Sequence, residues 1–150
     1  MTPTKNASAV PASDTSAEPR FLTVDPRVPE SIRQLLEEAD GCLNMSFATG
    51  GTACARRAVQ MILTTEQVDG DEYAANLIAL SEKHPAVAPA LLQILQVLGD
   101  GEAPLTPDSL RALIVTIKAV LYEVYVLGAE RIERLMYVHQ LVESLAPAAA

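Results

Sequence analysis

The stretch DSLRALIVTIKAVLYEVYVLGAERIERLMYVHQLVESL, from Asp108 to Leu145, decides the fold. It contains no proline and a single glycine, Gly128, so it predicts one long final helix. On a helical wheel the apolar residues up to Leu127 form two stripes on opposite sides: a first stripe of Leu110, Leu113, Ile114, Ile117, Val120, Leu121, Val124 and Leu127, and a second of Ala112, Val115, Ala119, Tyr122 and Val126. A surface helix needs only one apolar stripe, so this helix is expected to be covered on two sides.

The pattern changes beyond Gly128. The second stripe becomes polar, whereas the first stripe continues through Ile132, Leu135, Val138, Val142 and Leu145. An unbroken helix of this length would measure about 57 Å at 1.5 Å per residue. A body of roughly 120 residues is only about 35 Å across. The helix is therefore expected either to break near Gly128 or to project beyond its own bundle.

The second stripe also predicts self-association. The remaining helices are short, so covering both stripes of the long helix within one chain is difficult. An exposed apolar stripe of this size is unusual on a monomer. We therefore expect a homodimer whose interface contains Val115, Ala119, Tyr122 and Val126.

Four shorter helices are expected before the long one, joined by loops that contain proline, glycine or acidic residues. We place them from Pro29 or Glu30 to the pair Gly50–Gly51, from Thr52 onward, from about Glu72 to Lys83, and from about Val87 to Leu98. Thr106 is expected to cap the final helix, with Pro107 at its first position. The fold class is thus all-α, a five-helix antiparallel bundle.

The domain organisation follows from composition. Residues 1–20 are rich in Thr, Ser, Ala and Pro and show no periodicity, which indicates a disordered tail. Residues 21–146 form one helical domain, and 147–150 a short tail. The loop around Gly70 carries four acids, but without the ligand spacing of a calcium loop it indicates a solvated turn.

Charge and motif content exclude several classes of protein. The chain has 150 residues and a formal net charge of −8, which argues against general binding of nucleic acid. It has neither a secretory leader nor 18 uninterrupted apolar residues, so we expect a cytoplasmic protein and no membrane contact. Cys42 and Cys54 are expected to be buried small side chains. No standard nucleophile, phosphate-binding or metal motif is present, so no cofactor and no metal are expected.

The pair Arg56–Arg57 is the clearest basic spot in the chain. It allows two interpretations: ion pairs with an acid of the first helix, such as Glu37 or Glu38, or a binding site for a small anionic ligand or nucleotide. We favour the ion pair and keep the ligand site as an alternative.

The residues Glu38, Ala39, Cys42 and Leu43, followed by the run from Ala55 to Val59, resemble the bacterial and phage domain of unknown function catalogued as family 4145. Its members are similar to HEPN-type (higher eukaryote and prokaryote nucleotide-binding) helical domains. The resemblance spans about residues 29–127. It implies a HEPN-like bundle and a role in a defence or restriction context.

The chain departs from the family's Arg-x-x-Gly-Asn-x-x-Ala-His signature. Gly99 and Ala103 match it, but the positions expected to be Arg, Asn and His hold Gln96, Asp100 and Pro104. The cation and the acid/base group are both absent, so the nuclease activity that HEPN relatives imply loses its chemical basis here.

A second arrangement keeps a catalytic alternative open. Arg134 and His139 have the Arg-x4-His spacing of HEPN ribonucleases, but they lie far down the last helix and the spacing recurs easily by chance. We therefore predict a non-catalytic helical interaction and dimerisation module. The alternatives are a metal-independent ribonuclease that uses Arg134 and His139, and an anionic-ligand binder that uses Arg56 and Arg57.

Overall fold

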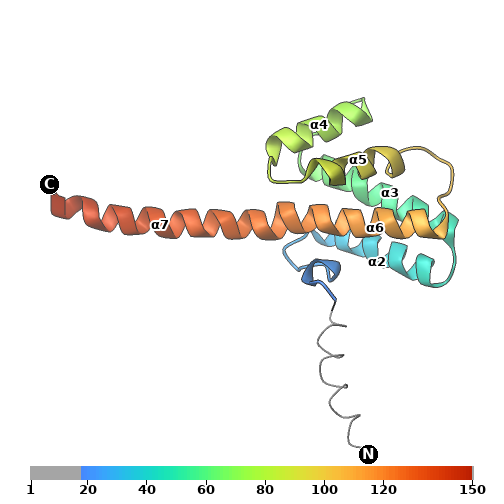
Figure 1. Ribbon diagram of the computed structural model, residues 1–150, viewed down its shortest axis with the longest axis horizontal. Helices are drawn as coiled ribbons and strands as arrows, with labels where there is room; N and C mark the ends of the chain where they lie inside the picture. The colour runs from blue at the N-terminus through green and yellow to red at the C-terminus, as the bar shows by residue number, and fades with distance from the viewer. Residues whose placement is uncertain (1–17, 150) are drawn as a thin grey trace, which may run out of the picture.

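The computed structural model describes residues 18–149, with side chains to residue 145, and this part of the chain is all-helical with no strand. A 3₁₀ turn, η1 (Arg20–Leu22), precedes the helices (Figure 1). These are α2 (Glu30–Asn44), α3 (Ala48–Thr65), α4 (Tyr73–Lys83), α5 (Pro89–Leu98) and a final helix composed of α6 (Pro107–Leu121), the π-helical segment η2 (Tyr122–Leu127) and α7 (Gly128–Ala149). The predicted all-α antiparallel bundle is confirmed. The disordered tail predicted for residues 1–20 falls almost wholly outside the described residues.

Helix α6 forms the centre of the bundle, packed against α2, α3 and α5. The side chains of its first stripe from Leu110 to Leu121 are at most 2% exposed. The Thr106 hydroxyl accepts a hydrogen bond from the Ser109 amide at 3.2 Å, and Pro107 occupies the first turn, as predicted. Burial of the first stripe against three helices therefore holds the bundle together.

The turn between α2 and α3 differs from the prediction. Helix α2 ends at Asn44, and Ser46 takes a left-handed φ of 63°, whereas Gly50 and Gly51 lie inside the first turns of α3. A Cβ added to Gly51 would lie 2.6 Å from Leu110 Cδ2 and 3.2 Å from Cys42 Cβ. Gly51 is thus required for close packing of α3 on α6 and α2, and it does not end a helix.

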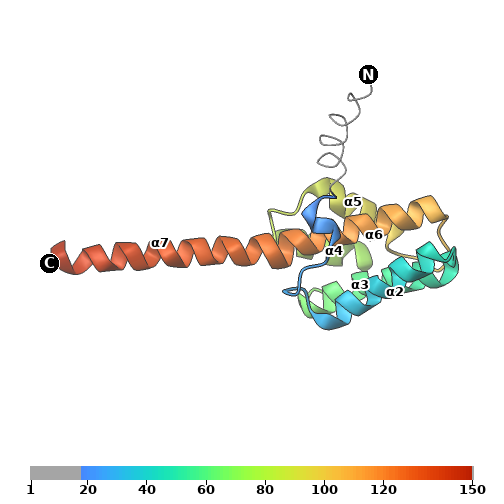
Figure 2. The same ribbon diagram turned by 90° about the horizontal axis from the view of Figure 1, so that it is seen from below.

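The final helix neither breaks nor stays within the bundle. It continues through Gly128, and α7 runs straight out of the body in two perpendicular views (Figures 1 and 2). The base of α7 is held by Arg27, whose guanidinium lies 3.7 Å from the carboxylate of Glu130. Of the two outcomes that the sequence allowed, the structure shows projection.

The π-helical segment changes which way α7 faces. Hydrogen bonds from residue i to i+5 accommodate about one extra residue per turn, so every later side chain is turned back by about 100°. The straight wheel that carried the first stripe from Leu127 to Ile132 is therefore wrong past η2. The apolar stripe of α7 therefore turns away from the core side of α6, toward the edge of the helix that carries Thr116.

The second stripe is only partly open. Val126 is 1% exposed, because Phe21, Val24 and Val28 of the N-terminal segment pack around it and Tyr122. Val115 is 37% exposed, and Ala119 is half-buried. The prediction that Val126 lies in a dimer interface is wrong, since the chain itself covers this end of the stripe.

Candidate functional site: an apolar helix and an apolar groove

The largest exposed apolar surface of the described residues lies on α7. We call it the α7 apolar face, and it comprises Ile132, Leu135, Met136, Val138, Leu141, Val142 and Leu145. The exposed fractions of these side chains run from 49% for Leu141 to 70% for Leu145. Met136 and Leu141 lie at the two edges of this face, about 140° apart around the helix. Glu133 and Ser144 lie opposite its middle, whereas Gln140 borders Met136. A helix whose large apolar side chains bury nothing against their own chain is a surface for binding another molecule.

The final helix is also long and apolar enough to be compared with a membrane span. Over Pro107–Leu145 its most apolar 18-residue window has a mean hydropathy of 1.8, and 44% of that window is buried inside the bundle. By length and composition alone this helix could cross a membrane, but one such helix is weak evidence, because the core helices of globular domains meet the same criteria.

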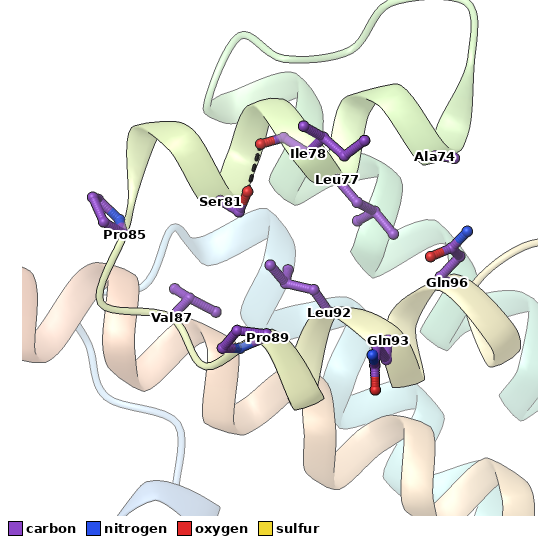
Figure 3. A pocket seen from close by; sticks show the side chains of 10 residues that line it. All are labelled: Ala74, Leu77, Ile78, Ser81, Pro85, Val87, Pro89, Leu92, Gln93 and Gln96. Carbon is purple, nitrogen blue, oxygen red and sulfur yellow. Dashed lines mark hydrogen bonds between the residues drawn. The ribbon is translucent and has the colours of Figure 1, made fainter.

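A second apolar surface lies between α4 and α5 (Figure 3). We call it the α4–α5 groove. It has a volume of about 390 Å³, and no charged residue lines it. Its lining residues are Ala74, Leu77, Ile78, Ser81, Pro85, Val87, Pro89, Leu92, Gln93 and Gln96. Leu77 and Val87 form a buried floor, whereas Ile78 on the rim is 61% exposed. The Ser81 hydroxyl donates to the Ile78 carbonyl at 2.6 Å, so its donor is satisfied within α4.

Arg56 has a structural role that the sequence did not predict. Its guanidinium donates to three backbone carbonyls at the end of α5 and in the loop that follows: Leu98 and Gly101 at 3.1 Å, and Ala103 at 2.7 Å. The favoured ion pair with the first helix is not formed, and these donors are not free for an anionic ligand. Arg57 lies on the exposed side of α3.

Arg134 and His139 both lie on the exposed surface of α7. They are five positions apart, so they point about 140° apart around the helix. His139 Nε2 lies 3.2 Å from a carboxylate oxygen of Glu143, one turn further on. Within one copy these two side chains therefore do not converge on a common point, and a shared site would need a second chain.

Glu66 lies at the centre of a polar cluster that the sequence analysis missed. Its carboxylate receives a 2.7 Å hydrogen bond from the Tyr125 hydroxyl and contacts His84 Nε2 at 2.6 Å, while Lys83 donates to its backbone carbonyl at 2.6 Å. The cluster joins the end of α3, the end of α4 and the π-helical segment. The spacing of Glu66, His84 and Tyr125 in the sequence gives no indication that their side chains are in contact. Glu66, interpreted as part of a solvated turn, is only 9% exposed.

The electrostatics of this cluster favour an ionised carboxylate. Burial alone would raise the pKa of Glu66, but hydrogen bonds from Tyr125 and His84 outweigh it and hold that pKa below its usual range. Burial, reinforced by the bond to Glu66, raises the pKa of the Tyr125 hydroxyl, which stays protonated as a donor. Because both oxygens of Glu66 are engaged, the cluster ties three elements together.

The fold and these surfaces have no counterpart in the comparisons with known proteins. No protein-family model matches the chain, and no similar sequence or structure was found among curated proteins and solved structures. The resemblance to family 4145 therefore stays a prediction.

Proposed function

We propose that this chain is a non-catalytic helical interaction module that forms a homodimer, and that α7 is its binding element. The α7 apolar face carries the proposal. Seven large side chains, each leaving on the order of 100 Å² in water, expose roughly 700 Å². That is close to the about 800 Å² that each partner contributes to a standard-size interface. The proposal replaces the stripe around Val126 with a surface further along the same helix.

The test places a charge within the α7 apolar face. The Val142→Glu protein should elute as a folded monomer in size-exclusion chromatography with light scattering, under conditions in which the wild type is a dimer. A carboxylate desolvated against apolar side chains has no compensating partner. The matched control is Ser144→Glu, which adds the same charge two residues away, opposite the middle of the apolar face, and should remain dimeric. A wild type that stays monomeric at high micromolar concentration contradicts the proposal.

The ribonuclease alternative keeps one structural argument. Both Arg134 and His139 are exposed on the helix that the proposal places at an interface, so two copies could bring them together. We nevertheless expect no RNA cleavage by pure protein without metal, because nothing in one copy orients either side chain toward the other. Cleavage that is lost in both Arg134→Ala and His139→Ala would establish the ribonuclease instead.

A further inference from the structure

The α4–α5 groove has no occupant from its own chain. In Figure 1, α4 lies at the edge of the bundle, packed on α5 and α3, and α7 extends away from the body. Ile78 on the groove's rim therefore stays in water unless another molecule covers it. A helix that lays an apolar face into an apolar groove is a recurring mode of recognition between proteins.

The α7 apolar face is poorly suited to pairing with another α7 alone. From Ile132 to Leu145 it covers two heptads. Two-stranded coiled coils typically sustain their apolar repeat over three or four heptads or more, and short isolated helices are marginal in water. In a groove between two helices, α7 would have neighbours on two sides. It would therefore bury more apolar surface per residue than it would against a single second α7.

The chemistry and position of the two surfaces match. Leu141, Val142 and Leu145 at the far end of α7 would meet a groove lined by apolar and uncharged polar groups, where no charge would be desolvated opposite them. One end of the groove, at Pro85, lies close to Glu123 and Arg131 at the base of α7. A second copy running antiparallel can thus place its α7 in this groove while receiving the first copy's α7 in its own.

We propose that α7 of one copy lies in the α4–α5 groove of a second copy, and that two such contacts close a symmetric dimer. This inference rests on the proposed function of α7 as the binding element. It assigns a second, separate surface to the same dimer. The area is sufficient, because each protomer contributes both its roughly 700 Å² on α7 and its groove, which together exceed one partner's share of a standard interface.

Substitutions in the two surfaces separate this inference from pairing of α7 with α7. Ile78→Glu places a charge on the exposed rim of the groove without touching α7, and it should raise the dimer dissociation constant at least about 100-fold, as Val142→Glu should. The matched control is Ala75→Glu, on the exposed side of α4 outside the groove, which should dimerise like the wild type. Circular dichroism checks that each variant is folded.

Mixing the two defective proteins is the decisive step. The Val142→Glu copy keeps an intact groove and the Ile78→Glu copy keeps an intact α7, so their mixture should recover a heterodimer through one intact contact. Cross-linking checks the same contact. In a background of Cys42→Ser and Cys54→Ser, an Ile78→Cys protein mixed with a Val142→Cys protein should be joined by a short bismaleimide.

Each remaining outcome has one meaning. If Val142→Glu is monomeric but Ile78→Glu still forms the wild-type dimer, the groove is not the acceptor and the inference is wrong, while the proposed function stands. If neither variant dimerises and their mixture gives neither heterodimer nor cross-link, the inference is also wrong. A monomeric wild type overturns the proposed function itself.

Discussion

Helices α6 and α7 are two halves of one continuous helix, both rich in large aliphatic side chains, yet one is buried and the other is bare. Leu113 in α6 is fully buried, whereas Leu135 in α7 is 66% exposed. The difference lies in the neighbours, because α2, α3 and α5 end where α7 begins to project. Apolar content shows that a surface is to be covered, and the neighbouring elements decide whether the chain itself covers it.

The largest expected difference between the two halves is in stability. Leu113→Ala should lower the free energy of unfolding by about 2–5 kcal/mol, because it leaves a cavity in the core. Val142→Ala should change it by less than about 0.5 kcal/mol in protein dilute enough to be monomeric, because that side chain has no partner in the chain. Urea denaturation followed by circular dichroism measures both. A comparable loss for both variants would mean that α7 folds back onto the bundle.

The junction between the halves should respond to pH through Glu66. Its pKa is lower in the folded chain than the 4.5 of a free glutamate, so its ionised form stabilises the fold. This contribution is complete above the unfolded-state pKa and is lost as the pH falls through the folded-state value. The gap in unfolding free energy between wild type and Glu66→Gln should therefore shrink as the pH falls below about 4.5.

Tyr125→Phe is the companion variant at this junction. Removing the hydroxyl leaves one buried Glu66 oxygen without its donor, which should cost about 1–3 kcal/mol at neutral pH. Equal stability of wild type and Tyr125→Phe, measured by the same denaturation, would show that water replaces this donor at no cost and that the bond does not anchor the π-helical segment.

The smallest expected effects concern the arginine pair. Arg56→Ala should destabilise the bundle by about 1–2 kcal/mol, since three carbonyls at the end of α5 and in the following loop lose a charged donor. Arg57→Ala should stay within about 0.5 kcal/mol. Thermal-shift measurements with nucleotides test the ligand alternative at the same time. A nucleotide-dependent shift that disappears in Arg57→Ala would restore a binding role for this pair.

The periodicity of the sequence determined the helices and their order. Pro107 and Thr106 fixed the start of α6, and Pro85 separated α4 from α5, because each acts through its own backbone. The first stripe of α6 was predicted as core for the same reason: a 3.6-residue period places those side chains on one side whatever surrounds them. The projection of the last helix was one of two outcomes inferred from its length alone.

Other features depended on neighbours remote in sequence. The glycine pair was interpreted as a helix end because its partners, Leu110 and Cys42, approach only in the folded bundle. Arg56 donates to a carbonyl 45 positions further along the chain. Glu66 accepts a hydrogen bond from Tyr125, which lies 59 positions further along. The π-helical segment, which sets the direction of the α7 apolar face, leaves no periodic signal. Local patterns determine which side of a helix is apolar, and the tertiary structure decides what that side meets.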